Sequence, residues 1–556
     1  AQVAGVPVES TPAEQADEHA PTTGAPTNAE GEPVSEGTIV VTGSRIRRNT
    51  YSTDAPIDLI TKEDTVLAGA RSTAEVLQSS TVTSGTAQIS PTFLGFVSEG
   101  GPGANTVGLR GLGASRTLVL LNGRRLAPAG AGPELIAADL NVLPTGIVQR
   151  IEVLREGASS IYGSDAVAGV INVITETKLN GLTVDFYTNQ PIQHGGGGRN
   201  YRGSLVWGKT FDRGHITASL EYRQTTGLRV GDRDDFSCPK DLFVNPATGE
   251  PAGHEKPDST EPRCWPFQYE TIGTAHNYIL SGSFATGAVN RYSFPTGDLS
   301  QPLLVNDYKV RPLASPNQLA THVLSPVKTY TAYVNAAHEV GDDGLELYGE
   351  ALFTQRRSLQ TSSTQIAWDP NQTGRELYGG TFAGYTWEEL GEIYGNPNYF
   401  TFPFFPDSIA AQGDHFARFF ISPEPTTSRQ KINFFRTNGG LRGDLGIKDW
   451  RFDTNLQYSR TKSRYSVEQI DVNKFNNAFT PVLAPAGTPD SVITVALPGE
   501  AGAGNAYTCA SNVTDGAYNG GDCIPFNVFD PHVLAGNLPR GGLDYLYDEH
   551  VGHTAF

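Results

Sequence analysis

The stretch that decides the fold is RIEVLREGASSIYGSDAVAGVINVITE, residues 150–176, together with LRGLGASRTLVLLNGRR, residues 109–125. In the first segment, two apolar and β-branched runs at 151–154 and 170–175 enclose a turn-rich centre of glycine, alanine and serine. In the second, an apolar run at 117–121 ends in Asn122-Gly123, a pair that supplies the positive φ angles of a type I′ hairpin turn. Both patterns predict short buried strands joined by tight turns.

These two segments resemble the plug domain of TonB-dependent outer-membrane receptors. The family's recurrent phrases stand here almost letter for letter, apart from Glu156 where Gly is usual and Ala158 where Pro is common. The residues of this plug signature are Arg110, Gly111, Asn122, Gly123, Arg150, Glu152, Arg155, Tyr162 and Gly163. The resemblance implies a mainly β fold, a transmembrane antiparallel β-barrel of about 22 strands when complete, occluded by an α/β plug over residues 44–180.

The composition suits this fold class and excludes others. The chain has 62 glycines, 22 tyrosines and 26 phenylalanines with only 18% charged residues, as expected of a turn-rich and aromatic-rich β protein. It holds no run of 18 apolar residues that would indicate a transmembrane helix. A net charge of −18 repels phosphate backbones, so nucleic acid is not an expected partner.

Four cysteines fall in two local pairs, Cys238 with Cys264 and Cys509 with Cys523. Four cysteines allow three connectivities, and local pairing is the simplest of them. The neighbouring residues are loop formers, which favours two disulfides over four free buried thiols. Disulfides would place these loops in an oxidising compartment such as the periplasm or the cell surface.

The first 43 residues divide into a leader and a short β-type run. Residues 1–37 carry seven acidic side chains and no Lys or Arg, so they bury too little apolar surface to fold and form a disordered periplasmic leader. The run that follows resembles the family's TonB box and consists of Thr38, Ile39, Val40, Val41, Thr42 and Gly43. Its free backbone groups suit strand addition to a partner protein. The alternative is that it is simply the first strand of the plug.

From residue 181 to 556 the sequence alternates apolar and polar residues, the pattern of outer-membrane strands. We expect Leu182, Leu205, Trp207, Leu220 and Leu347 to face lipid, and Glu221, Glu346 and Asn455 to face the lumen. Tight turns at 211–214, 341–344 and 447–450 alternate with long connections at 225–327, 358–429 and 464–542. Only seven full strands and the start of an eighth at 543–556 are found, so the chain is expected to cover the first part of a barrel. A soluble β-sandwich is the alternative.

No catalytic or metal-binding constellation stands out. The HExxH, GxSxG, CxxC and P-loop spacings are all absent, and the 11 histidines are scattered. The sequence therefore predicts neither an enzyme nor a cofactor, and His215 and His338 are expected to be ordinary strand residues. We expect the plug arginines Arg110, Arg150 and Arg155 to lie against Glu346 and Glu350 of the barrel wall, or else to cap plug strands in solvent.

The resemblance implies energy-dependent import across the bacterial outer membrane. Its expected partners are the TonB-type energy-transducing complex of the inner membrane, outer-membrane lipid and a small or medium-sized substrate. A remaining barrel polypeptide or a surface lipoprotein is a further candidate partner. Loops rich in aromatic residues and Asn, 368–407 and 505–527, favour an oligosaccharide or oligopeptide, against self-packing of the loops. A ferric siderophore is the alternative substrate, and a non-transporting surface binding or scaffold protein is the alternative function.

Overall fold

The structure is a computed structural model of the 556-residue chain. It describes residues 57–67, 72–80, 83, 103–130, 137–192, 197–237, 316–341, 344–363, 423–447, 450–478, 480–496, 504–527, 533, 537–538 and 541–555. Of six further strands it describes the backbone alone: β10 (Phe243–Val244), β11 (Pro251–Ala252), β12 (Thr271–Ala275), β13 (Val289–Ser293), β17 (Ile366–Trp368) and β18 (Phe416–Ile421). The expected leader, the segment 38–43, Cys238 and Cys264 lie outside the described residues.

The N-terminal domain, here called the plug, is built on a five-stranded sheet of order β1-β4-β5-β2-β3. Its strands are β1 (Ile57–Thr61), β2 (Thr117–Leu121), β3 (Arg124–Arg125), β4 (Val148–Leu154) and β5 (Gly169–Thr175). β5 pairs antiparallel with β4 and parallel with β2. All five residues of β2 are buried, and the turn after it has φ angles of 51° at Asn122 and 74° at Gly123. The predicted buried strand and its type I′ turn are confirmed.

Short helices cover the plug sheet: α1 (Lys62–Leu67), α2 (Thr73–Ser79) and α3 (Ser159–Tyr162), with 3-10 turns η3 (Ala114–Arg116), η4 (Leu140–Val142) and η5 (Ser164–Ala166). Helix α2 begins because the Ser72 hydroxyl accepts a hydrogen bond from the Glu75 amide, which satisfies one of the free donors at a helix start. The same helix buries Ala74 and Leu77 in the core.

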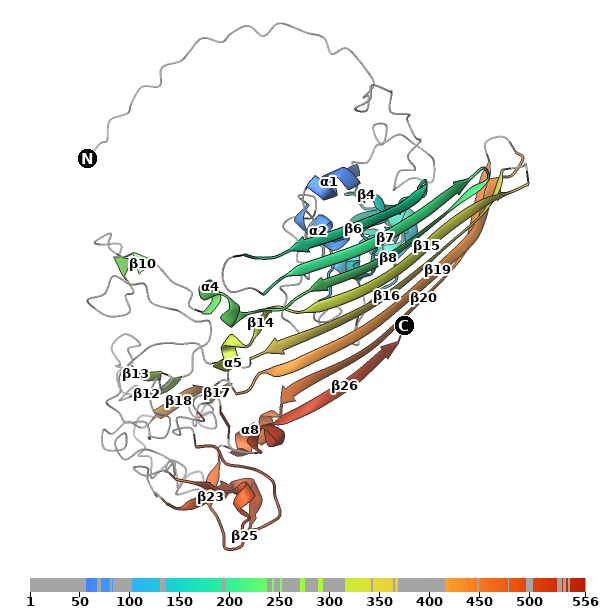
Figure 1. Ribbon diagram of the computed structural model, residues 1–556. Helices are drawn as coiled ribbons and strands as arrows, with labels where there is room; N and C mark the ends of the chain where they lie inside the picture. The colour runs from blue at the N-terminus through green and yellow to red at the C-terminus, as the bar shows by residue number, and fades with distance from the viewer. Residues whose placement is uncertain are drawn as a thin grey trace, which may run out of the picture.

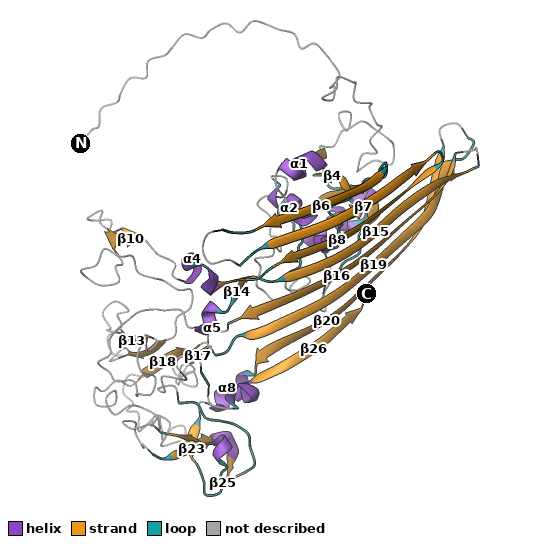
Figure 2. Ribbon diagram, viewed as in Figure 1, coloured by secondary structure: helices purple, strands orange, loops and turns teal. Residues whose placement is uncertain are grey.

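An open eight-stranded antiparallel sheet, here called the wall, follows the plug in the order β26-β20-β19-β16-β15-β8-β7-β6 (Figure 1). Its strands are β6 (Gly181–Asn189), β7 (Asn200–Phe211), β8 (Gly214–Thr225), β15 (Val327–Val340), β16 (Leu345–Ser362), β19 (Thr426–Asp444), β20 (Arg451–Ile470) and β26 (Tyr547–Ala555). Figure 2 shows these strands side by side as the largest regular part of the molecule. The sheet agrees with the expected seven strands and the start of an eighth.

The wall alternates as the sequence predicts. Leu182, Leu220 and Leu347 are 63%, 59% and 52% exposed on the outer face, whereas Glu221 and Glu350 are buried on the face toward the plug. The plug core continues into the wall on that inner face, because Ile151 and Val173 of the plug belong to one buried cluster with Leu352 and Phe434. The outward-facing and inward-facing sides expected for these residues are confirmed.

The strands run further toward the long connections than expected. β16 continues to Ser362 and β19 begins at Thr426, so the expected connection 358–429 is shorter at both ends. β20 ends at Ile470, so the expected connection 464–542 begins later in the chain. Apolar alternation alone sets strand limits too short here, since polar residues such as Ser and Gln keep the same backbone ladder. The expected strand start at 543 is also wrong, because α10 (Gly542–Leu546) precedes β26.

The long connections carry small elements that gather beyond one end of the wall (Figure 1). They are β9 (Leu228–Arg229), η6 (Val230–Asp232), α4 (Asp234–Ser237), α5 (Pro316–Leu319), β14 (His322–Leu324), α8 (Val472–Ala478), β21 (Pro481–Leu483), η8 (Asp490–Val492), β22 (Thr494–Val495), β23 (Ala506–Cys509), η9 (Ala510–Asn512), β24 (Val513–Thr514) and β25 (Ala517–Tyr518). In the described part of the chain, no helix is both long enough and apolar enough to cross a membrane.

Candidate functional site: the contact between plug and wall

The β2–β3 turn of the plug inserts Asn122 into a buried polar cluster of the wall. Asn122 Nδ2 donates to Glu350 Oε2 at 2.7 Å and to the hydroxyl of Tyr333 at 2.9 Å. Glu350 also accepts a hydrogen bond from Tyr333 at 3.0 Å and from Arg436 of the neighbouring strand. The charge of the Glu350 carboxylate is therefore compensated by Arg436 within the wall. The carboxylate can still accept the hydrogen bond from Asn122 that holds the plug turn.

Next to this turn, Arg124 reaches the more exposed edge of the wall. Its Nη2 donates to Asp453 Oδ2 at 2.6 Å and to the hydroxyl of Tyr348 at 2.7 Å. In the amide orientation that satisfies both groups, the oxygen of Asn455 accepts from Arg124 Nε at 3.1 Å. Gln457 Nε2 also donates to the carbonyl oxygen of Arg125 at 2.9 Å. Asn455 thus lies on the plug-facing side of its strand, as the sequence predicted.

A third contact is fully buried and centres on Asp139 of the plug. Asp139 Oδ1 accepts from the backbone amides of Asn105 and Asn141 at 3.1 and 3.0 Å, and its Oδ2 lies 3.3 Å from Arg356 Nε of β16. Arg223 of β8 donates to the carbonyl oxygen of Asn141 at 2.7 Å. Two wall arginines therefore bind one plug segment. Arg356 compensates the charge of the Asp139 carboxylate, because a buried carboxylate needs a nearby cation and hydrogen-bond donors.

At the fourth contact a wall carboxylate binds plug backbone. Glu221 Oε2 accepts from the amides of Thr145 and Gly146 at 3.0 and 2.9 Å, while its Oε1 lies 3.0 Å from Arg223 Nε. Gly146 is required here by close approach: a Cβ at this position would lie 2.8 Å from Ser204 Oγ. At this point the wall therefore binds backbone groups of the plug.

The three plug arginines expected to face the wall do not reach it. Arg110 donates to the carbonyl oxygens of Val167 and Ala168 within the plug. Arg150 pairs at 2.9 Å with the wholly buried Glu152 on its own strand, and Arg155 pairs with Asp58. That expectation is wrong because groups of the plug itself, which lie close to these arginines in the folded domain, bind all three guanidinium groups.

The two wall carboxylates of that expectation have other partners. Glu346 pairs with Arg442 on the adjacent strand, and Glu350 pairs with Arg436 and Asn122. Sequence reasoning missed Arg124, Asp139 and Arg436 as contact residues. The signal that could have found them is position in the sequence: Asn122 lies in the two-residue turn that follows the buried strand β2, and Arg124 comes directly after that turn.

Other signature residues shape the plug. Gly111 and Gly163 adopt φ angles of 71° and 89°, which favour glycine. The carbonyl oxygen of Tyr162 accepts a hydrogen bond from Arg125, whose guanidinium also pairs with Asp165. These residues hold the turn-rich centre of the 150–176 segment against the β3 strand, so they contribute to the geometry of the plug.

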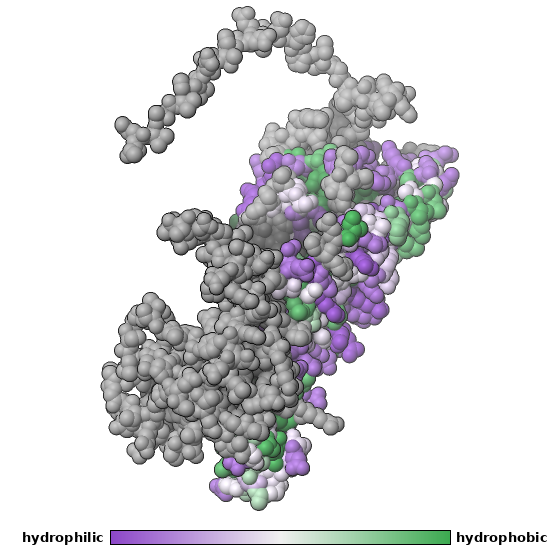
Figure 3. Space-filling model, turned by 60° about the vertical axis from the view of Figure 1, so that its left-hand side comes forward, coloured by the Kyte–Doolittle hydropathy of each residue, from purple (hydrophilic) through white to green (hydrophobic). Residues whose placement is uncertain are grey.

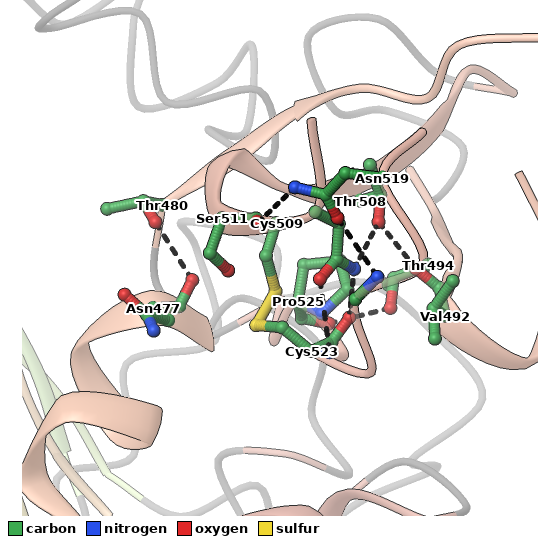
Figure 4. Close-up of a disulfide and its surroundings, with 12 residues drawn as sticks. Asn477, Thr480, Val492, Thr494, Thr508, Cys509, Ser511, Asn519, Cys523 and Pro525 are labelled. Atoms are coloured by element: carbon green, nitrogen blue, oxygen red, sulfur yellow. Dashed lines mark hydrogen bonds between the residues drawn. A yellow bond between two sulfur atoms is a disulfide. The ribbon is translucent and has the colours of Figure 1, made fainter. Parts of the chain in front are cut away.

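In the connection between β20 and β26, residues 504–527 form a lobe closed by Cys509–Cys523, with Cα atoms 5.8 Å apart (Figure 4). Asn512 Nδ2 donates to Thr508 Oγ1 at 2.9 Å and to the carbonyl oxygen of Cys523 at 2.7 Å. This predicted disulfide is confirmed. Tyr507 and Phe526 are buried inside the lobe, so loop self-packing, and not substrate stacking, explains these two aromatic residues.

His322, at the loop end of the wall, is held neutral. Its Nδ1 accepts a hydrogen bond from the Thr361 amide at 3.0 Å. Burial lowers the pKa of His322 below its ordinary value, and the nearby cation Arg229 lowers this pKa further, against an opposing effect of Asp232. The imidazole therefore joins β14 to the end of β16 as a hydrogen-bond acceptor.

The fold and these contacts define a class: a small α/β domain docked by polar contacts on the inner face of an antiparallel sheet whose outer face is apolar. Residues 49–170 match the family model described as TonB-dependent Receptor Plug Domain. Over these residues the N-terminal domain is similar to the plug domain of TonB-dependent receptors, and the open eight-stranded antiparallel sheet follows it in the chain.

The chain is also similar to individual proteins over part of their length. The chain is 31% identical over 209 residues to the vitamin B12 transporter BtuB of Vibrio cholerae serotype O1, a match covering 36% of this chain and 31% of the relative. Among solved structures, a mutant of the ferric enterobactin receptor PfeA from Pseudomonas aeruginosa shows 16% identity and a TM-score of 0.32, covering 82% of this chain and 54% of that one. The siderophore receptor PirA from Pseudomonas aeruginosa shows 15% identity, a TM-score of 0.29 and coverage of 75% and 51%. The chain therefore spans about a third to a half of these relatives.

Proposed function

We propose that the protein imports a nutrient across the bacterial outer membrane, driven by a TonB-type energy-transducing complex that grasps residues 38–43 from the periplasm. The observation that carries this proposal is a plug domain docked on the inner face of a membrane-type sheet through hydrogen-bonded side chains. Such contacts exchange for water contacts at small net cost once water enters. They suit a domain that is held at rest and displaced under load.

The strand order of the plug determines which strand a pull on residues 38–43 reaches first. β1 is the first described strand after the 38–43 segment, and it forms the edge of the plug sheet with β4 as its single neighbour. A pull from the periplasm therefore acts first on a strand held by one ladder, from Ile57 paired with Leu154 to Thr61 paired with Arg150. The ion pair between Arg155 and Asp58 ties the same two strands and would be the first side-chain contact loaded.

For the substrate we infer an oligosaccharide or oligopeptide, on the aromatic and Asn content of residues 368–407, of which the structure describes only the backbone of Trp368. A ferric siderophore is the competing substrate class. A corrinoid is a third, because the vitamin B12 transporter is the curated relative described above. Direct binding of representatives of each class to the purified chain, measured by calorimetry, distinguishes them.

A non-transporting surface binding or scaffold protein on the same fold is the alternative from another class. Such a protein would need no TonB box. The test is Val40→Pro, which removes a backbone donor and fixes φ, and so obstructs strand addition to the partner. Its matched control is Val34→Pro, the same change in the leader just upstream.

We expect Val40→Pro to abolish energy-dependent uptake while outer-membrane abundance and surface binding of the cargo stay unchanged. The Val34→Pro variant should take up cargo like the unmodified protein. Undiminished uptake by Val40→Pro would remove the transport proposal and leave the scaffold function as the better one.

A further inference from the structure

The inner face of the wall carries four charged side chains in one row, at the end where tight turns join the strands. The strand register places Glu339 of β15 opposite Glu346, Glu346 opposite Arg442, and Arg442 opposite Asp453 of β20. We call these four residues the charge row. Arg442 pairs with Glu346, although Asp453 is an equally direct neighbour on the other side. The single cation of the charge row therefore lies between two carboxylates.

The plug supplies a second cation to this row. Arg124 Nη2 donates to Asp453 Oδ2 at 2.6 Å, and the Tyr348 hydroxyl donates to Asp453 Oδ1 at the same distance. The side chains of Arg124 and Asp453 are 28% and 45% exposed, so water reaches this contact. Hydrophilic surface of this kind lies apart from apolar surface on the face shown in Figure 3. The charge row is therefore open to an exchange of partners, unlike the buried pair of Arg356 with Asp139.

Tyr348 brings the two arginines close together. The guanidinium carbon of Arg442 lies 5.2 Å from the centroid of the Tyr348 ring, and that of Arg124 lies 5.9 Å from the same point. Both distances suit cation–π attraction, but two cations that share one ring also repel each other. Gly440 lies directly opposite Tyr348, and a Cβ there would lie 2.7 Å from the tyrosine hydroxyl oxygen. Glycine at position 440 therefore leaves room for the ring against β19.

We propose that Arg442 is the replacement partner of Asp453 and binds it when the plug turn leaves the wall. Residues directly opposite each other on neighbouring strands have Cβ atoms about 4.5–5.5 Å apart, within the reach of an arginine side chain. The several N–H donors of one guanidinium can serve Glu346 and Asp453 together. Without Arg442, release of the plug turn would leave Asp453 with no cation in the charge row. With it, one exposed ion pair takes the place of another, so release costs less free energy.

This inference rests on the proposed function for its role, because only a plug that is displaced and returns needs such a partner. The expected effect of a substitution has an unusual sign. Arg442→Gln removes a cation from the wall, yet it should hold the plug turn more firmly, since Asp453 then has Arg124 but no cation of the charge row. Glu346→Gln releases Arg442 from its resting partner, so it should loosen the turn.

The experiment measures hydrogen exchange of the full chain in detergent micelles, without partner protein or cargo, so its failure is distinct from failure of the proposed transport. The reporter is the amide of Leu126, which donates to the carbonyl oxygen of Val119 at 3.0 Å, directly after the two-residue edge strand β3. So short a strand has little protection of its own once the turn leaves the wall. We expect Arg442→Gln to slow exchange about threefold and Glu346→Gln to accelerate it about threefold, because an exposed ion pair contributes up to about a factor of five.

Arg442→Lys keeps the cation and should exchange like the unmodified protein. The matched control is Arg429→Gln, the same change of charge at an exposed position near the other end of β19, and it should have no effect. In a protein that carries Asp453→Asn, Arg442→Gln should lose its effect, since the carboxylate for which the two cations compete is gone.

Faster or unchanged exchange in Arg442→Gln would overturn the proposal, because Arg442 would then support the docked turn or play no part in its release. Slowing that persists in the presence of Asp453→Asn would overturn it as well. Equal slowing by Arg429→Gln would have the same consequence, since the net charge of the wall would then explain the result.

Discussion

Single residues decide how firmly the plug is held. Glu221 is the clearest case, because one carboxylate oxygen binds the backbone amides of Thr145 and Gly146. Glu221→Ala leaves both buried donors without this acceptor, and each charged hydrogen bond contributes about 1.5–3 kcal/mol. We expect hydrogen exchange at these two amides to accelerate on the order of a hundredfold or more, measured by mass spectrometry.

The control for this prediction is Glu346→Ala. Glu346 faces the same side of the wall but pairs with Arg442, which is half-exposed, and makes no plug contact that the structure describes. Exposed ion pairs contribute about 0–1 kcal/mol, so exchange at Thr145 and Gly146 should not change. Equal acceleration in both variants would mean that Glu221 acts through general destabilisation of the wall.

A second residue gives the wall a pH dependence. The folded pKa of His322 lies below its ordinary value of 6.5, so its contribution to stability is present above about pH 6.5 and is lost as the pH falls through the folded pKa. Protonation of Nδ1 removes the acceptor of the Thr361 amide. We expect protection of that amide to fall below pH 6.5, after correction for intrinsic exchange. His322→Asn should flatten this dependence, and a persistent pH effect in that variant would assign it to another group.

At the scale of elements, the lobe between β20 and β26 behaves as a unit of its own. Cys509 and Cys523 are 14 residues apart, and closing a loop of that length contributes about 3 kcal/mol. Replacing both cysteines with Ala should make residues 504–527 sensitive to protease, while strands β19 and β20 remain protected because 17 paired residues join them. Protease sensitivity spreading into β20 would contradict the independence of the lobe.

At the scale of the whole molecule, the proposed function requires the plug to move against the wall. Gly146 and Ser204 offer a covalent lock, since an ideal Cβ on Gly146 would lie 3.0 Å from Ser204 Cβ and a disulfide needs about 3.5–4.5 Å. A shift of roughly half an ångström admits the bridge. We expect Gly146→Cys with Ser204→Cys to bind cargo yet import none until a reductant is added.

Ser204→Cys alone is the control for the lock and should import normally. If the doubly substituted protein imports cargo while mass mapping shows the bridge formed, the plug does not need to leave the wall at this contact. The path for the substrate would then lie elsewhere along the plug surface.

The sequence by itself determined the local architecture. The run 117–121 with Asn122-Gly123 predicts a buried strand and its turn, because a continuous apolar run and positive φ angles depend on neighbouring residues only. Strict alternation likewise predicts which side of each wall strand faces outward, as Leu220 and Glu221 show. Cys509 and Cys523 were paired correctly for the same reason, since their separation is short.

Only the tertiary structure decided which residues join plug and wall. Asn122 meets Glu350, and Asp139 meets Arg356, across more than 200 positions of sequence. These pairings depend on the register of eight strands and on the orientation of the plug against them, both set by many weak contacts at once. Arg150 could equally have reached the wall by charge alone, but Glu152 on the same strand lies closer and holds it.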